Sequence, residues 1–184
     1  MFKKAVFLDR DGVVTYDVGY FYRPEQVKLL PGVETLRELE KDGFLLVIVS
    51  NQSVVARRML SKKGLWEIDK LIRRKLKRVG VNIKASYYCP HHPDFAGPCQ
   101  CRKPKPGLFL KAIKELNIDP RSSFIIGDKP SDLEAGKRAG VGMSILVKRN
   151  SKVWDATKEE LVKIKLKAKN LAEAIKIILE KNES

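Results

Sequence analysis

The stretch Ala5-Val6-Phe7-Leu8-Asp9-Arg10-Asp11-Gly12-Val13 decides the fold of this chain. Val6 to Leu8 read as a short apolar strand, which stops at two aspartates one residue apart. In parallel α/β sheets, ligands bind where the strands end, at the carboxyl edge. Two carboxylates there repel each other unless a cation lies between them, and a hard divalent cation is the usual partner. The alternative is an Asx-turn, because Asp is a good turn former.

Length and charge narrow the class of protein. The 184 residues suit one domain with a full hydrophobic core. No apolar run approaches the roughly 18 residues of a membrane span, so no membrane partner is expected. Met1 to Lys4 lead directly into the first strand, from which we expect no cleavable signal and a cytoplasmic protein, taken to be a monomer. The net charge of +15 favours anionic partners, either phosphorylated metabolites or nucleic acid.

The rest of the chain alternates strands and helices. This pattern predicts a single Rossmann-like α/β domain over 1–184, an open and mostly parallel sheet with helices on both faces. Further strands are expected at 45–49, 83–88, 124–126 and 144–147. Helices are expected at 31–43, through the basic segment as far as 80, at 106–117 and 131–139, and from 170 onward. Strict alternation over 162–168 predicts an edge strand with its lysines outward.

Much of the positive charge lies between Arg57 and Lys84. One interpretation is the solvated face of an amphipathic helix, because apolar residues recur at helical spacing: Leu65, Ile68, Ile72, Leu76 and Val79. The other is a nucleic-acid surface. Trp66 is the sole aromatic ring between Val54 and Ala85, so the stacking platform typical of such surfaces is missing and nucleic acid is an unlikely partner.

Polar residues follow several of the expected strands. The second strand ends in Ser50-Asn51-Gln52-Ser53, and the fourth is followed by Gly127-Asp128-Lys129-Pro130-Ser131-Asp132. Folding would bring to one rim Asp9, Asp11, Ser50, Lys103 and Asp128. This set offers a nucleophile, an acid/base, a hydroxyl donor, a cation and a metal-binding carboxylate, which are the groups that phosphoryl transfer requires. Alone, Ser50 would be a strand-end turn residue and Lys103 a surface lysine.

All three cysteines fall in one loop, residues 89–101, just before the helix expected near 106. The spacing of Cys89, His91, Cys99 and Cys101 fits a Cys₃His zinc site. Four protein ligands leave no open position, so the zinc would be structural. A disulfide would leave one cysteine over, and free thiols are the remaining alternative. Sequence leaves His91 and His92 both open as the fourth ligand.

The four motifs DxDG, a strand-terminal Ser, Arg-Lys-Pro-x-Pro and GDxxxD, in this order, resemble those of the haloacid dehalogenase-like phosphatases. The resemblance implies that Asp9 is the nucleophile and Asp11 the general acid/base, while Ser50 and Lys103 hold the phosphoryl group. It implies Mg²⁺ on the Asp9 carboxylate, the Asp11 backbone carbonyl and Asp128. Asp132 would orient Lys103 or a metal-bound water.

The cysteine loop, with Asp17-Val18-Gly19-Tyr20 and Ser50 to Ser53, resembles the histidinol-phosphatase-like branch, and within it the phosphatases of D-glycero-D-manno-heptose 1,7-bisphosphate. The segments between motifs are too short for a large cap. Substrate contacts implied by the resemblance are Arg10, Asp17, Gly19, Tyr20, Asn51, Gln52, Ser53, Arg102 and Lys129. The substrate expected is a small sugar bisphosphate, with histidinol phosphate as the alternative and a polynucleotide 3′-phosphate as a third. Val18, Val54 and Arg57-Arg58 depart from the family pattern, and these departures bear on sugar specificity and not on the chemistry.

Overall fold

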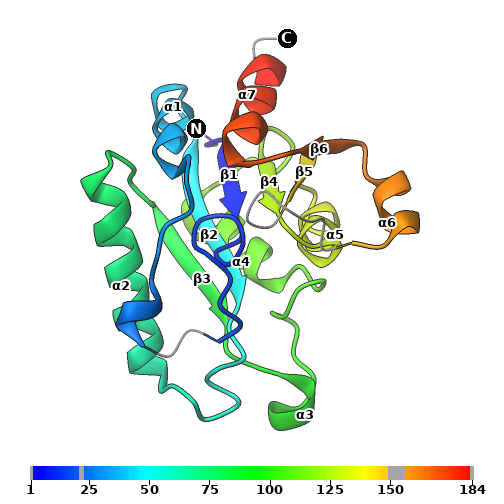
Figure 1. Ribbon diagram of the computed structural model, residues 1–184. Coiled ribbons are helices and arrows are strands. Elements are labelled where there is room, and N and C mark those ends of the chain that lie inside the picture. Colours follow the sequence, from blue (N-terminus) through cyan, green and yellow to red (C-terminus); the bar gives the residue numbers. More distant parts are fainter. Residues whose placement is uncertain (1, 21–22, 149–155, 183–184) are drawn as a thin grey trace.

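The computed structural model of the chain describes residues 2–20, 23–148 and 156–182. Six strands form one sheet in the order β3-β2-β1-β4-β5-β6, and all neighbours pair in parallel (Figure 1). The strands are β1 (Ala5–Leu8), β2 (Leu45–Asn51), β3 (Ala85–Cys89), β4 (Phe124–Gly127), β5 (Met143–Val147) and β6 (Leu166–Ala168). This is the doubly wound order in which the direction of winding reverses between β1 and β4.

Helices cover both faces of the sheet, as the sequence predicts. They are the 3₁₀-helices η1 (Pro24–Gln26) and η2 (Val33–Thr35), and the α-helices α1 (Leu36–Lys41), α2 (Lys62–Arg78), α3 (Pro93–Ala96), α4 (Gly107–Leu116), α5 (Pro130–Arg138), α6 (Lys158–Lys163) and α7 (Leu171–Asn182). No helix in the described ranges is long and apolar enough to cross a lipid bilayer.

The core consists of two apolar layers divided by the sheet. Val6 and Leu8 of β1 pack into the layer under α1, α2 and α7. Ala5 and Phe7 point the other way, into the layer under α4 and α5. Because successive side chains of a strand alternate between faces, a central parallel strand must be apolar throughout. The four buried residues of β1 meet this requirement. The backbone of the next residue, Asp9, is held by a hydrogen bond from its N–H to the carbonyl of Ile126 (3.0 Å).

Three expectations need correction. Residues 162–168 are not one strand: Thr157 and Glu160 form a capping box that starts α6, this helix runs to Lys163, and only Leu166–Ala168 form the edge strand β6. The helix expected at 31–43 begins as the 3₁₀-turn η2, and α1 itself covers Leu36–Lys41. Val79 lies beyond the end of α2 and is exposed, so it does not belong to that helix's buried face.

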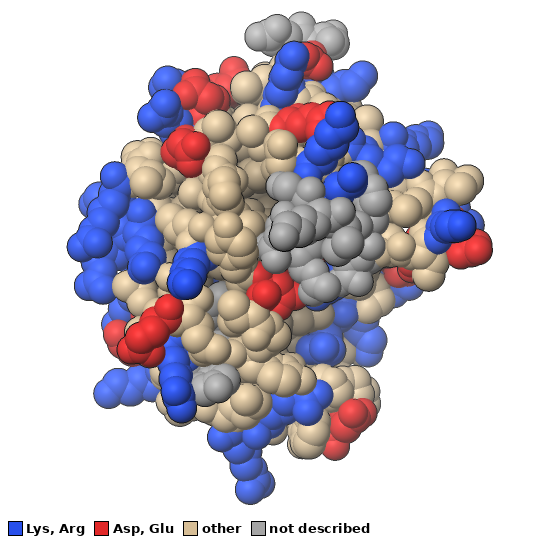
Figure 2. Space-filling view, viewed as in Figure 1, with Lys and Arg blue, Asp and Glu red and all other residues tan. Residues whose placement is uncertain are grey.

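The remaining residues of the apolar stripe on α2 are buried as expected, namely Leu65, Ile68, Ile72 and Leu76. The opposite face carries exposed cations, among them Lys62, Lys63, Lys70, Arg74, Lys77 and Arg78. Figure 2 shows Lys and Arg gathered at the left edge of the molecule, where α2 lies. This is the distribution expected of an amphipathic surface helix.

Candidate active site

The functional side chains expected from the sequence converge at the carboxyl edge of the sheet, between β1 and β4. Asp9 follows β1 and Asp128 follows β4, and both are buried. One carboxylate oxygen from each of Asp9, Asp128 and Asp132 lies within 4.8 Å of the others. The ends of two adjacent strands and the first turn of α5 therefore hold three acidic groups at the switch point of the sheet, where this fold binds ligands.

Lys103 provides the positive charge that this acidic cluster requires. Its Nζ atom lies 2.7 Å from Oδ1 of Asp9, 2.6 Å from Oδ1 of Asp132 and 2.8 Å from the carbonyl oxygen of Val49. Burial by itself lowers the pKa of Lys103, but the Asp132 and Asp9 carboxylates outweigh it and hold the pKa above its ordinary value. The side chain is therefore a fixed ammonium ion between two carboxylates.

The backbone of Lys103 is held by Asn51 at the end of β2. The Asn51 side chain donates to the carbonyl oxygen of Lys103 (3.2 Å) and accepts from its N–H (3.0 Å). Asn51 is expected from the family resemblance to contact substrate, and in the structure both ends of its side-chain amide bond to the loop that presents the lysine. Asn51 therefore fixes the position of the cation.

Gly127 allows Asp132 to reach the cluster. A Cβ atom at Gly127 would collide with Cβ of Asp132, so only glycine leaves room for the first turn of α5 against the end of β4. Asp132 then accepts a hydrogen bond from the Lys129 N–H (3.1 Å) and pairs with Lys103. The contact with Lys103 agrees with the expectation that Asp132 orients the lysine.

Asp128 carries the strongest sign of a cation site. Both of its carboxylate oxygens are buried and have no hydrogen-bond partner among the described residues. Burial, with Asp9 and Asp132 close by, raises the pKa of Asp128 to about 8. An unpaired carboxylate among other carboxylates is what a hard divalent cation with oxygen ligands stabilises. The residues present fit Mg²⁺, with Asp9 and Asp128 as carboxylate ligands.

Asp11 does not belong to this cluster, and its carboxylate is held by hydrogen bonds from neighbouring side chains. Arg10 Nε and Nη2 donate to its two oxygens at 2.7 and 3.0 Å, Gln52 Nε2 at 2.8 Å and Thr15 Oγ1 at 3.2 Å. Arg10 is 0% exposed and Gln52 3%, and Gln52 also accepts from Arg10 and donates to Ser50. Both side chains are turned toward Asp11, and a contact of Arg10 or Gln52 with substrate stays a prediction.

The cysteine loop closes into a compact four-ligand cluster. Sulfur–sulfur distances among Cys89, Cys99 and Cys101 are 3.1 to 3.6 Å, and Nδ1 of His91 lies 3.2 Å from Cys101 Sγ and 3.8 Å from Cys89 Sγ. Tetrahedral zinc with bonds of about 2.3 Å holds its sulfur ligands roughly 3.8 Å apart, so a modest expansion fits the ion. His92 instead contacts Asp94 and Phe95, and this arrangement favours His91 over His92 as the fourth ligand.

Gly107 anchors this loop to the core. A Cβ atom there would collide with the backbone of Gln100, and the Gly107 N–H donates to that same carbonyl oxygen (3.2 Å). Arg102 Nη1 donates to the carbonyl of His91 (3.0 Å), so this expected substrate contact also binds the loop. The cysteine cluster is therefore tied to Arg102 and to the first turn of α4. Lys103 lies between these two attachment points.

The other expected substrate contacts lie on the rim of the site. Asp17 pairs with Lys129 at 3.8 Å and accepts from the Gly19 N–H at 2.8 Å. The Arg57 guanidinium lies over the rings of Tyr20 (5.1 Å) and Phe95 (4.7 Å), and so joins three loops. Ser53 is half-buried in the turn after β2.

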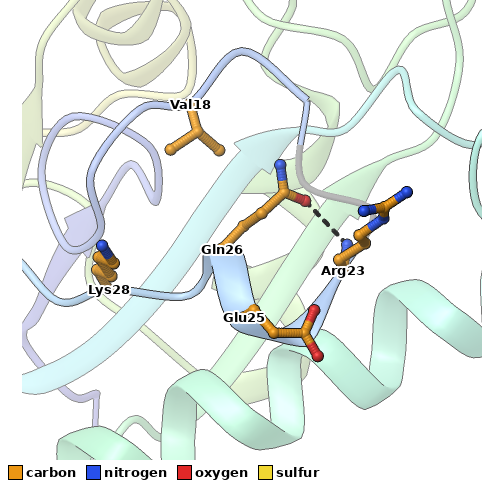
Figure 3. Close-up of a pocket in the computed structure, with 5 residues that line it drawn as sticks. All are labelled: Val18, Arg23, Glu25, Gln26 and Lys28. Carbon is orange, nitrogen blue, oxygen red and sulfur yellow. Dashed lines mark hydrogen bonds between the residues drawn. The ribbon is translucent and has the colours of Figure 1, made fainter.

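A hollow of about 570 Å³ lies beside the Asp17–Tyr20 loop, lined by Val18, Arg23, Glu25, Gln26 and Lys28. Figure 3 shows Lys28 and Arg23 at its two ends, with Gln26 between them accepting from the Arg23 N–H (2.9 Å). None of the acidic cluster lines this hollow, so the hollow is separate from that cluster.

Three residues that shape the site were not predicted from the sequence, namely Gly127, Gly107 and Thr15. Gly127 and Gly107 were readable as the glycines directly before Asp128 and after Pro106, where a side chain would block close packing. Thr15 follows Asp11 by four residues, a spacing that gave no signal of its own. Arg10 was identified, but the direction of its side chain depends on which way the chain turns after β1.

Buried carboxylates, a fixed lysine and a divalent-cation site at the carboxyl edge of a doubly wound sheet define a Rossmann-like enzyme of phosphoryl transfer. The model of the haloacid dehalogenase-like hydrolase family matches residues 4–140. The chain belongs to that family of hydrolases, as the resemblance of its four motifs predicts.

Two curated relatives are named D-glycero-beta-D-manno-heptose-1,7-bisphosphate 7-phosphatase. The one from Pasteurella multocida is 43% identical over 163 residues, covering 86% of this chain and 89% of the relative. The one from Haemophilus influenzae is 44% identical over 155 residues, covering 82% and 84%. Among solved structures, the D,D-heptose 1,7-bisphosphate phosphatase from B. bronchiseptica, complexed with magnesium and phosphate, has a TM-score of 0.82 at 28% identity, covering 97% of this chain and 99% of the other.

Proposed function

We propose that this protein is a Mg²⁺-dependent phosphatase that removes the 7-phosphate of D-glycero-D-manno-heptose 1,7-bisphosphate. The observation that carries the proposal is the group formed by Asp9, Lys103 and Asp128, in which a nucleophilic carboxylate, a fixed cation and an unpaired carboxylate meet. The names of relatives at 43% and 44% identity supply the substrate.

In this proposal the Asp9 carboxylate attacks phosphorus, and the bond to the sugar oxygen breaks as the aspartyl-phosphate forms. Lys103, with the Ser50 hydroxyl, balances the charge that spreads over the equatorial oxygens. Asp9 and Asp128, with the Asp11 carbonyl, would hold Mg²⁺, which when bound adds further positive charge at the phosphoryl group. Since Lys103 is bonded to Asp9 before substrate arrives, little reorganisation is needed.

Asp11 provides the proton transfers. It gives a proton to the departing sugar oxygen in the first step, and takes one from the water that attacks the aspartyl-phosphate in the second. The water oxygen bonds to phosphorus, the Asp9–phosphorus bond breaks, and inorganic phosphate leaves. The donors around Asp11 keep its carboxylate in one orientation through both steps.

The charge on the rim supports a substrate with a second phosphate. Arg57 Nε is buried with no hydrogen-bond partner among the described residues, and Lys129 is 41% exposed beside Asp128. A second phosphate would find cations here, whereas the imidazolium and amine of histidinol phosphate would require carboxylates. We therefore rank the bisphosphate above histidinol phosphate.

The test is a comparison of kcat/KM on the heptose bisphosphate, histidinol phosphate and a 3′-phosphorylated oligonucleotide, with ³¹P NMR to show which phosphate leaves. We expect the bisphosphate to be preferred at least tenfold, with loss at C7. Preference for either other compound overturns the substrate, and failure to hydrolyse any of the three with Mg²⁺ overturns the chemistry.

We also propose that the enzyme works as a monomer in the cytoplasm, with a structural zinc. Every residue of the proposed chemistry comes from one chain, and three thiols held as zinc ligands suit a reducing compartment. Light scattering of the purified protein tests the first statement, because a stable dimer at micromolar concentration would contradict it.

A further inference from the structure

A buried polar chain leads from the general acid/base to the basic helix α2. Arg10 lies two residues beyond Leu8, and its Cζ is 5.7 Å from the centre of the Tyr88 ring on β3. The Tyr88 hydroxyl donates to Oδ1 of Asp69 on α2 at 2.6 Å. Arg10 and Asp69 are 0% and 2% exposed, so both charged side chains lie inside the protein.

We propose that Arg10 is a positioning residue for Asp11, and that Tyr88 and Asp69 hold Arg10 in the orientation that this role requires. The inference rests on the proposed function, because it concerns the residue assigned there as acid/base. The Arg10 side chain is 0% exposed, and its hydrogen bonds run to Asp11 and Gln52. Its action on the reaction passes through the two hydrogen bonds to Asp11 and the one to Gln52.

The geometry explains why an arginine serves here. A guanidinium offers donors in a rigid planar fork, so contact with both carboxylate oxygens fixes the plane of the acid as well as its distance. Gln52 closes the arrangement by accepting from Arg10 and donating to Asp11. A lysine has one donor centre and would leave the carboxylate free to rotate.

Tyr88 and Asp69 define the other face of the fork. A ring face within about 6 Å attracts a guanidinium, and the attraction grows in a site without water. The Asp69 carboxylate accepts the tyrosine hydroxyl and so fixes the ring that the guanidinium contacts. The arginine is thus held from both sides, and its position depends on a helix residue remote from the reacting atoms.

Neighbouring Tyr87 offers a matched control. It also lies on β3, is equally buried at 8% against 9%, and donates its hydroxyl to a helix carboxylate, Glu115 Oε2, at 2.9 Å. It belongs to the apolar layer on the opposite face of the sheet from Tyr88 and has no contact with Arg10 among the described interactions. Tyr87→Phe therefore removes the same kind of hydrogen bond without touching the chain to Asp11.

The experiment compares kcat and KM on two substrates. The heptose bisphosphate is an alkyl phosphate whose leaving oxygen needs a proton, whereas the leaving group of p-nitrophenyl phosphate requires none. We expect Tyr88→Phe to lower kcat on the alkyl phosphate about fivefold and Arg10→Lys about fiftyfold, with KM changed less than twofold. The loss on p-nitrophenyl phosphate should be several times smaller. Tyr87→Phe should leave both rates unchanged, and Asp69→Asn, which still accepts from Tyr88, should keep most of the activity that Asp69→Leu loses.

Two outcomes separate failure of this inference from failure of the proposed function. If Asp11→Asn loses the alkyl phosphatase activity but Tyr88→Phe and Tyr87→Phe behave alike, or both substrates fall equally in Arg10→Lys, the positioning role is wrong. If Asp11→Asn retains full activity on the alkyl phosphate, the acid/base assignment itself is wrong, and the inference falls with it. Circular dichroism at the assay temperature, and a Tm above that temperature, establish that each variant compared is folded.

Discussion

Replacing Lys103 with Met tests the electrostatic centre of the site. Lys103 is 5% exposed and its ammonium bonds two carboxylates, whereas a methionine side chain fills a similar volume without charge. Removing one partner of a buried ion pair costs about 3–5 kcal/mol. At about 2–4 °C per kcal/mol for a domain of this size, we expect Tm to fall by roughly 6–20 °C. Because Asn51 holds the backbone of residue 103, the loss should come from charge and not from movement of the loop.

The sign of the pH dependence identifies the cause. Burial raises the pKa of Asp128 to about 8. Burial also raises the pKa of Asp132, although Lys103 partly opposes this shift. Carboxyls with raised folded pKa values destabilise the protein as pH rises from about 4, the unfolded value, through the folded pKa. Without Lys103 this penalty grows, so the Tm difference from wild type should be larger near pH 8 than near pH 5.5.

The assay is differential scanning fluorimetry with EDTA or Mg²⁺ at both pH values, together with phosphate release. Mg²⁺ should recover part of the lost Tm near pH 8, because it supplies charge to the same carboxylates, while kcat stays about 10²–10³-fold lower. Lys105→Met is the control: its ammonium donates to the Cys99 carbonyl (2.8 Å), so about 1 kcal/mol without pH dependence is expected. An equal loss for Lys103→Met at both pH values, unchanged by Mg²⁺, would refute the reasoning.

Four further expectations concern the metals and the nucleophile. Asp9→Asn should lower kcat at least about 10³-fold in phosphate-release assays while circular dichroism stays native; measurable turnover near wild type would remove it as nucleophile. Mg²⁺ should raise wild-type Tm more near pH 8 than near pH 6, because protons compete for Asp128; the reverse order would contradict its role as ligand. Elemental analysis should find one zinc per chain, lost in His91→Ala and kept in His92→Ala, and zinc in the former would reassign the ligand. Gly127→Ala should displace Asp132 and lower both Tm and kcat, and a silent substitution would show that α5 tolerates a shift.

The architecture was predictable because the apolar strands of this chain are short, continuous and bounded. β1, β2 and β4 appear where uninterrupted apolar runs predict them, and the polar motifs follow directly, so their meeting at one edge is a property of parallel topology. The C-terminal part was harder. Residues 162–168 alternate like a strand, but the local capping box at Thr157 starts a helix that consumes the first part of that pattern.

The chemistry of the site was predictable as a set of groups, but the directions of the side chains were not. Arg10, Asn51, Gln52 and Arg102 all stand in motifs, and a motif cannot distinguish a side chain that contacts a ligand from one that supports a neighbour. Burial and hydrogen-bond partners make that distinction, and in this structure they turn all four toward the protein. The zinc ligand was undecided for the same reason, since His91 and His92 differ only in direction.

The grip of Asn51 on the peptide atoms of residue 103 has a further consequence. Because Asn51 contacts only main-chain atoms, the backbone of residue 103 should keep its position whichever side chain it carries, although the buried carboxylates still require a cation. Trimming Lys103 to alanine would leave a small anionic hole walled by Asp9, Asp132 and the Val49 carbonyl, suited to methylammonium from solution. An amine from solution could then supply the positive charge that the Lys103 side chain normally provides.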